Sequence, residues 1–301
     1  MTMRPLALDD RSLVVDYLRR FPPEISELTF TNLYAWHRTR QIWLDTFRDS
    51  LVFFTELPTG LVVFGNPVGP VSLAEVLFDY GRLIIGADRF PKAMVPDASL
   101  LPGIKVVEDR DNNDYVYRQE QLANLAGRHF TKKRNHINQC LAAYPCQYEI
   151  ITPETTAECL DLQERWCMAR DCRDEPGLCG EYLAIKETLH HYQDFDLIGG
   201  AIRIDGAIQA FSIGEPLNAS TAVCHFEKSM PEFQGLGQVI NQWFAKNSLA
   251  GFDYINREQD LGVPGLRVAK ESYYPEHLVE KVQIMRSGAS LDKPVAHQRC
   301  D

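Results

Sequence analysis

The chain has 301 residues, 45% of them hydrophobic and 24% charged, a globular composition that excludes a disordered, collagen-like or low-complexity protein. The length predicts about two domains, and the net charge of −10 argues against sequence-independent DNA binding, because binding phosphates needs a basic footprint. No apolar run approaches the roughly 18 residues that span a bilayer, and the N-terminus lacks a signal-peptide pattern. We therefore expect a cytoplasmic protein with no transmembrane segment, whose eight cysteines are thiols.

The first half of the chain alternates helical and strand-like segments. Hydrophobic periodicity predicts helices over 11–20, 31–36 and 73–80. Alternation and turn sequences predict strands at 41–47, 51–56, 61–64, 82–85 and 104–107. The first three of these strands are expected to form an antiparallel meander.

The second half has the clearest pattern. Asp205-Gly206 is a strong hairpin signal, because both turn positions tolerate positive φ, and it predicts paired strands at 201–204 and 207–213. A third strand at 221–228 would place His225 and Glu227 on one face. The remaining elements expected are strands at 149–151 and 252–256 and helices at 119–126, 156–170, 181–191 and after Gly235. Together with the first half, this predicts an α+β (mixed α/β) fold.

Positive charge is concentrated in one window. No acidic residue lies between Glu120 and Glu149, whereas Arg128, Lys132, Lys133 and Arg134 are all basic. A solvated basic helix face explains this pattern as well as a phosphate-binding site does. The position favours phosphate, since Gly127 is expected to end the helix at 119–126 and backbone donors at the start of the next element also attract anions. We place the domain boundary here, giving domains at 1–126 and 127–287 and a disordered tail at 288–301.

A glycine pair precedes the helix that follows the third strand. This order of elements resembles the GNAT acyltransferase fold, in which central strands splay apart beside an acyl donor. Gly235 and Gly237 stand where that fold keeps its pyrophosphate-binding loop, in which small residues let backbone N–H groups approach phosphate. The nearby Glu232 carboxylate would oppose a pyrophosphate, and a simple turn is the alternative.

Acidic and basic residues also cluster after the strand at 252–256. Glu258 and Asp260 are candidates for a general base, or they neutralise neighbouring cations. Arg267 and Lys270 are three residues apart and would share a helix face suited to a phosphate or carboxylate. His225 and Glu227 could join them, although a histidine in a strand is more often a structural hydrogen-bonding residue.

A family resemblance is carried by 127–138 (GRHFTKKRNHIN), 199–206 (GGAIRIDG), 225–228 (HFEK) and 254–270 (YINREQDLGVPGLRVAK) with Ser272-Tyr273 and Pro275. It extends to 29–33 (TFTNL) and Trp36 near the start and to 114–117 (DYVY) before the basic window. With these motifs the chain resembles, over nearly its whole length, bacterial proteins of unassigned function grouped with the phosphatidylglycerol lysyltransferase C-terminal domain. The resemblance implies two GNAT-like domains in tandem, each a mostly antiparallel sheet flanked by helices. It also implies transfer of an aminoacyl group from a charged tRNA, as in Fem-type transferases.

The resemblance and the motifs together imply a set of site residues. The catalytic candidates are His225, Glu227, Glu258 and Asp260. The substrate-binding candidates are Arg128, Lys132, Lys133, Arg134, Asn135, Lys228, Asn256, Arg257, Arg267 and Lys270, and the candidates for a cofactor are Gly235 and Gly237.

Several alternatives stay open. The donor is a tRNA acceptor end or an acyl-CoA, used as a co-substrate, and the acceptor is a small molecule or a lipid headgroup. The lipid enzymes carry a multispan membrane region that we do not find here, which favours a soluble acceptor. A non-catalytic binding protein that retains the fold is a further hypothesis. No metal is expected, because Cys167, Cys172 and Cys179 lack the paired spacing of a zinc site.

Overall fold

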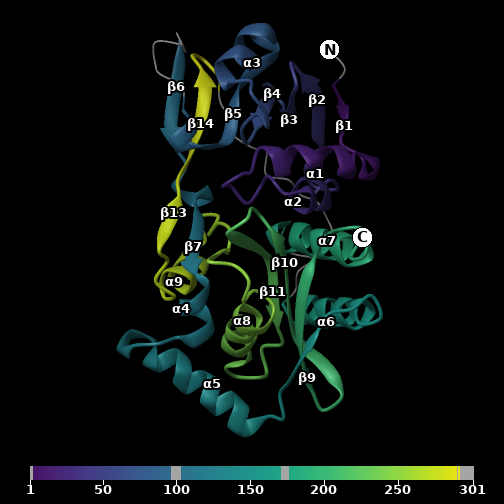
Figure 1. Cartoon of the computed structure of the whole chain (residues 1–301), viewed down its shortest axis with the longest axis vertical. Helices are drawn as coiled ribbons and strands as arrows, with labels where there is room; N and C mark the ends of the chain where they lie inside the picture. The colour runs from purple at the N-terminus through teal and green to yellow at the C-terminus, as the bar shows by residue number, and fades with distance from the viewer. Residues whose placement is uncertain (1–2, 96–102, 171–175, 290, 292–301) are drawn as a thin grey trace. The chain divides into compact units, whose positions relative to one another are not determined.

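The chain forms two compact units in the computed structural model, which describes residues 3–95, 103–170, 176–289 and 291 (Figure 1). Of the described residues, unit 1 takes those within 3–114, 259–266 and 278–291, and unit 2 takes those within 115–258 and 267–277. The domain boundary that we expect between residues 126 and 127 lies inside unit 2. Residues 278–287, which we expect at the end of the second domain, lie in unit 1. Most of the expected tail at 288–301 lies outside the described residues.

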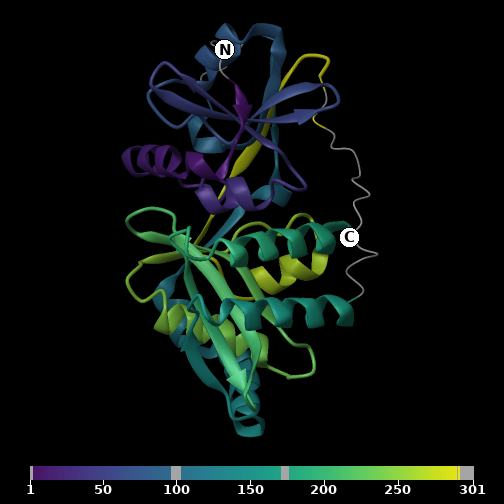
Figure 2. The same ribbon diagram turned by 90° about the vertical axis from the view of Figure 1, so that its right-hand side faces the viewer.

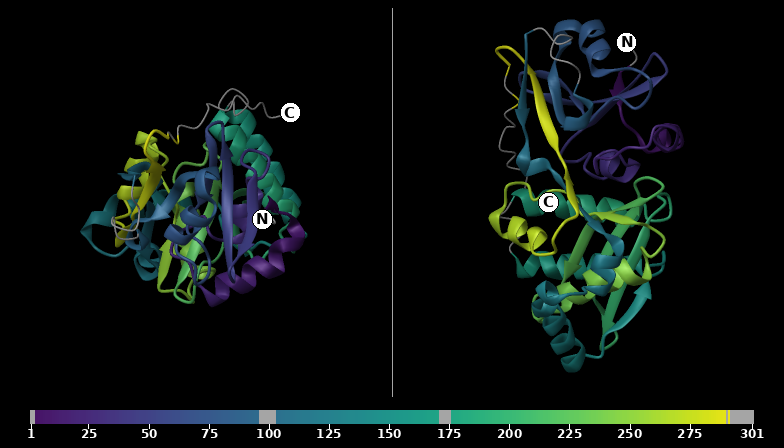
Figure 3. Two further views of the ribbon diagram at one scale, coloured as in Figure 1. Left: turned by 90° about the horizontal axis from the view of Figure 1, so that it is seen from above. Right: turned by 60° about the vertical axis from the view of Figure 1, so that its left-hand side comes forward.

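Unit 1 contains a sheet with the strand order β1-β2-β3-β4-β5-β14-β6. The predicted meander of β2, β3 and β4 is confirmed as antiparallel, whereas β4 and β5 are parallel. β14 pairs antiparallel with both β5 and β6, and Figure 3 shows this yellow strand within the blue sheet. The strand bounds are β1 Arg4–Pro5, β2 Ile42–Phe47, β3 Ser50–Leu57, β4 Gly60–Phe64, β5 Ile84–Pro91, β6 Ile104–Glu108 and β14 Lys281–Arg286.

The helices of unit 1 are α1 (Arg11–Arg20), α2 (Phe30–Ala35) and α3 (Leu73–Asp79). α3 begins with a capping box, in which the Ser72 hydroxyl accepts from the Glu75 N–H and the Glu75 carboxylate accepts from the Ser72 N–H. Its buried face packs on the sheet, so that Leu73, Val76 and Leu77 share a core with residues of β3, β4 and β5. A local signal therefore starts the helix and burial of apolar area holds it in place.

Unit 2 contains a second sheet, with the order β13-β7-β12-β11-β10-β9-β8. α6 and α7 lie side by side on one face of this sheet, as Figure 2 shows, and α8 covers the other (Figure 1). The strand bounds are β7 Asp114–Arg118, β8 Gln147–Ile150, β9 Ile198–Ile204, β10 Ala207–Pro216, β11 Thr221–Ser229, β12 Tyr254–Asn256 and β13 His277–Val279. The helix bounds are α4 Gln119–Asn124, α5 Thr131–Ala143, α6 Thr156–Ala169, α7 Pro176–His190, α8 Leu236–Asn247 and α9 Pro264–Glu271.

The two sheets repeat one pattern. Read from β1 and from β8, each has an outer strand, a three-stranded antiparallel meander, a parallel neighbour and two further strands. Each also has two helices before the meander and one helix between its parallel strands. The predicted α+β class, with two mostly antiparallel sheets flanked by helices, is confirmed.

The Asp205-Gly206 hairpin is confirmed between β9 and β10, with φ of 48° and 84° at the two turn residues. The predicted end of the helix at Gly127 is wrong. α4 ends at Asn124, and Leu125 adopts the left-handed conformation, with φ of 47°. The expectation that every cysteine is a thiol is wrong as well, because Cys167 and Cys179 are disulfide-bonded. Cys172 lies outside the described residues.

β11 departs from regular alternation at His225. Cys224 pairs with Gly214 and Phe226 pairs with Ile213, which leaves His225 at an irregularity in the register with β10. A bulge of this kind re-aims side chains. The prediction that His225 and Glu227 share one face through simple alternation therefore misses a local break in the strand.

Candidate functional site

The parallel pairing of β11 and β12 is short, and the strands part where the candidate residues lie. Pairs run from Thr221–Tyr254 to Val223–Asn256, and β12 then ends, while β11 continues to Ser229. Candidate residues follow on both strands, with His225 and Glu227 on β11 and Arg257 and Glu258 after β12.

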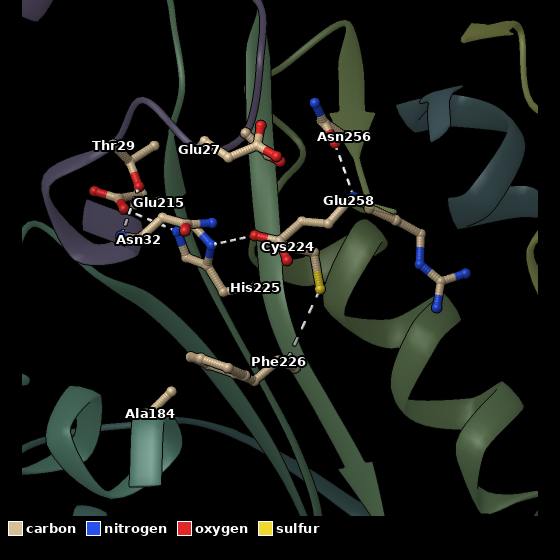
Figure 4. A network of polar contacts seen from close by, with 12 residues as sticks. Glu27, Thr29, Asn32, Ala184, Glu215, Cys224, His225, Phe226, Asn256 and Glu258 are labelled. Atoms are coloured by element: carbon tan, nitrogen blue, oxygen red, sulfur yellow. Dashed lines mark hydrogen bonds and ion pairs between the residues drawn. The ribbon is translucent and has the colours of Figure 1, made fainter. Parts of the chain in front are cut away.

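His225 lies between two carboxylates (Figure 4). Its Nε2 is 2.8 Å from Glu215 Oε1 on β10, and its Nδ1 is 2.7 Å from Glu258 Oε1. The side chain is only 2% exposed. Burial is the largest influence and disfavours the charged ring, but the bonds and charges of Glu215 and Glu258 outweigh it and raise the pKa of His225 to about 9. At neutral pH the ring is an imidazolium that donates to both carboxylates.

The backbone around Glu258 is fixed by several contacts. Its N–H donates to Asn256 Oδ1 at 2.8 Å, and its φ is 56°, which is unusual for a residue with a side chain. Its carbonyl accepts from the Tyr115 N–H at 3.1 Å and from Lys270 Nζ at 3.4 Å. Lys270 is buried and also donates to the Arg257 carbonyl. Asn256 and Lys270 thus contact the loop backbone.

Arg257 and Glu227 form a second cluster, beside the first one of His225, Glu215 and Glu258. Arg257 Nη2 is 3.1 Å from Glu227 Oε1, and Asn241 of α8 donates to Glu227 Oε2 at 3.0 Å. The guanidinium lies 5.1 Å from the centre of the Tyr273 ring and 5.8 Å from that of Tyr117. The Arg257 and Glu227 side chains are 14% and 22% exposed, so the carboxylate is oriented and still partly accessible to solvent.

Lys133 of α5 is part of this second cluster. Its Nζ donates to Ser272 Oγ at 2.7 Å and lies 3.5 Å from the centre of the Tyr273 ring. Burial, followed by the positive charges of Arg257 and Lys132, lowers the pKa of Lys133 to about 8. The charges of Lys133 and Arg257 therefore act directly on one another.

The other basic residues of this helix have different surroundings. Arg134 donates to the Leu125 and Gly127 carbonyls at 2.5 and 2.7 Å, where it closes the end of α4. Arg128 and Lys132 are exposed, as is Asn135. The predicted basic group thus divides into an exposed part, a capping residue and Lys133 beside Arg257.

Three further candidates have surroundings of their own. Asp260 belongs to unit 1, where its fully buried carboxylate accepts from Arg110 at 3.1 Å. Lys228 pairs with Glu181 of α7 at 2.6 Å and lies 3.9 Å from the centre of the Trp166 ring. Arg267 is half-buried on α9, the helix that also carries Lys270.

The glycine loop packs against α5. Gly235 has φ of 88°, and a Cβ there would lie 2.5 Å from the His136 carbonyl oxygen. At Gly237 a Cβ would lie 3.2 Å from Ser229 Oγ. The absence of a side chain at Gly235 therefore allows α8 to begin directly beside α5.

Gly235→Ala should lower the free energy of unfolding by about 2 kcal/mol or more. Alanine would have to adopt the left-handed φ of Gly235, and its Cβ would clash with the backbone carbonyl of His136. Urea unfolding measures this change. Gly251→Ala is the control, since a Cβ there meets no atom within 4 Å. Equal stability of the two variants would contradict this account of the loop.

Several site residues were not predicted. Glu215 and Asn241 contact the candidates, but their sequence positions carry no distinguishing motif. Tyr117, Ser272 and Tyr273 belong to the stretches that carry the family resemblance, but their contacts with Arg257 and Lys133 are visible only in the folded chain. Within the described residues, no group of three or more His, Cys, Asp or Glu side chains could hold a metal ion.

None of the helices in the described ranges combines the length and apolar character needed to cross a membrane. The family profile described as phosphatidylglycerol lysyltransferase, C-terminal, matches residues 18–284. No curated protein matches the chain.

Solved structures give the same assignment of fold. A conserved protein of unknown function from Bacteroides thetaiotaomicron is 33% identical, with a TM-score of 0.87 over 95% of this chain and 99% of that one. L-PGS from Bacillus licheniformis is 15% identical (TM-score 0.64; 94% and 93% covered), and FemX is 12% identical (TM-score 0.59; 95% and 98% covered). These two likenesses concern fold alone, and they confirm the predicted GNAT-like architecture. As its sequence motifs predict, the chain belongs to the family described as phosphatidylglycerol lysyltransferase, C-terminal.

Proposed function

We propose that unit 2 transfers an aminoacyl group from a charged tRNA to the amine or hydroxyl of an acceptor. The observation that carries this proposal is the Glu227 carboxylate, which two donors orient and which stays partly exposed where β11 and β12 part. A general base needs such a carboxylate within reach of the nucleophile's proton. Family membership supports aminoacyl transfer as the reaction class.

In this mechanism the acceptor attacks the carbonyl carbon of the aminoacyl ester while Glu227 takes its proton. The bond to the ribose oxygen then breaks, and the proton passes to that oxygen as the hydroxyl leaves. Holding donor and acceptor together supplies much of the rate. Arg128, in the short turn before α5, and Lys132, in the first turn of α5, are exposed and would bind donor phosphates, and Asn135 follows on the same helix.

Glu258 fits a supporting role better than that of the base. Its carboxylate is bonded to the His225 imidazolium, so the pair neutralises charge within the site. His225 and Glu258 would then be positioning residues that hold the loop bearing Arg257. The roles predicted for Arg267, Lys228, Gly235 and Gly237 remain predictions.

Glu227→Gln is expected to reduce turnover about 10²- to 10⁴-fold, because the amide keeps the shape of the side chain and cannot take the proton. The assay offers the purified protein labelled aminoacyl-tRNA and acyl-CoA pools in parallel, with small-molecule acceptors and lipid headgroups in separate arms. Loss of label and a new adduct report transfer. Labelled-donor binding is measured separately and should be unchanged.

Glu232→Gln is the matched control, since Glu232 is an exposed carboxylate five residues along the chain. An equal loss in both variants, or full activity of Glu227→Gln, would remove Glu227 as the base. Transfer from the acyl-CoA pool alone would replace the tRNA donor by an acyl-CoA. Loss from neither pool, with a folded sample, would favour a non-catalytic binding protein.

A further inference from the structure

We propose that Lys133 and Arg257 form a binding site for a single carboxylate or phosphate group of a small substrate. The identification of that ligand as a substrate rests on the proposed function, whereas anion binding itself can be measured without turnover. The site lies within unit 2 and takes residues from α5, from the loop after β12 and from the segment after α9.

Unused hydrogen-bond donors are the first observation. Among the described residues, the Arg257 guanidinium donates only to Glu227, and the Lys133 ammonium donates only to Ser272. A guanidinium carries five N–H donors and an ammonium three, so most of this capacity is free for a ligand. The planar guanidinium of Arg257 can donate two parallel hydrogen bonds, and with the lysine nearby it suits the oxygens of a carboxylate or phosphate.

The charge balance is the second observation. Lys133 and Arg257 carry two positive charges, and the carboxylate of Glu227 is bonded to Arg257. Lys132 adds a further positive charge that acts on Lys133. Burial, and then the charges of Arg257 and Lys132, lower the pKa of Lys133, which shows that the two cations repel the protonated lysine. An anion between the two side chains would relieve their repulsion.

The surroundings limit the size of the ligand. Arg257 is 14% exposed, and Tyr273 and Tyr117 lie beside its guanidinium. These rings restrict the side chain, so little conformational freedom is lost when a ligand binds. A long polyanion would instead contact the exposed Arg128 and Lys132. The Lys133–Arg257 site therefore fits one anionic group beside the Glu227 carboxylate.

The test titrates the full-length protein with inorganic phosphate and, separately, with acetate at constant ionic strength. Calorimetry gives the affinity, and reductive methylation followed by mass spectrometry gives the reactivity of Lys133. We expect Lys133→Met and Arg257→Gln each to weaken binding at least 10-fold. Arg257→Lys should give an intermediate loss, and the bound anion should slow methylation of Lys133 in the native protein at least 3-fold.

Lys246→Met is the matched control, because it removes one exposed lysine charge from α8, away from the residues of the proposed sites, and should change affinity less than 2-fold. Thermal unfolding confirms that each variant is folded. Preference for phosphate or for acetate would assign the group to a phosphate- or carboxylate-bearing substrate, and either supports the site. Equal losses in Lys246→Met and Lys133→Met, or methylation of Lys133 unaffected by anions, would overturn it. Failure of the Glu227→Gln assay would leave the binding result unchanged, so the two proposals fail separately.

Discussion

Lys281→Met should lower the free energy of unfolding by about 3–5 kcal/mol, because it would leave buried carboxylates without their cation. Lys281 Nζ lies 2.6 Å from both Glu27 Oε2 and Asp114 Oδ1, and all three side chains have no exposed area. Methionine has a similar length and no charge. The shift of the urea unfolding transition measures the loss.

The surrounding network explains why water cannot compensate for the missing lysine. Arg89 donates to Glu27 at 2.9 Å, and Gln259 donates to both Glu27 and Asp114. These residues belong to unit 1 and come from widely separated parts of the chain. Without Lys281, Glu27 would keep its ion pair with Arg89, whereas Asp114 would lose the ammonium 2.6 Å from its carboxylate, in a site where desolvation of charge is costly.

Lys92→Met is the matched control for this prediction. Lys92 also contacts two carboxylates, Glu108 at 2.9 Å and Glu280 at 3.1 Å, but its side chain is 40% exposed. Its loss should lower the free energy of unfolding much less than the loss of Lys281, since exposed ion pairs are screened. Equal effects at Lys92 and Lys281 would show that burial does not determine the energy of these pairs.

Local sequence signals predicted much of the fold, and long-range pairing did not follow from them. Asp205-Gly206 identifies its hairpin because the turn needs positive φ at two adjacent residues. β14 has no such signal, and it was not predicted. Its place between β5 and β6 depends on pairing with residues almost 200 positions earlier.

In the candidate site as well, residue types could be predicted from the sequence, whereas contacts between distant residues could not. Lys132 and Lys133 are equivalent as sequence, and only the packing of α5 leaves one exposed and places the other beside Arg257. His225 was identified by residue type, but the strand irregularity and the Glu215 contact are properties of the folded sheet. Asp260 resembled Glu258 in sequence, yet it is a buried partner of Arg110 in unit 1.

The pH dependence of stability should report the protonation of His225. Its pKa is raised from 6.5 to about 9 in the folded chain by Glu215 and Glu258, against the opposing effect of burial. A raised pKa means that the folded state binds the proton more tightly. The stabilisation is therefore fully present below pH 6.5 and is lost as the pH rises through about 9. Its size is on the order of 3 kcal/mol.

His225→Gln should remove this dependence, because glutamine does not titrate and cannot donate to both carboxylates as a cation. The measurement compares urea unfolding of the native protein and the variant from pH 6 to 10. Other groups, Lys133 among them, titrate in both proteins and cancel in the difference. The native protein should exceed the variant in stability most at pH 6, and the gap should narrow steadily towards pH 9. A constant gap would mean that His225 is neutral throughout, and the two carboxylates would then have to share a proton to remain buried beside it.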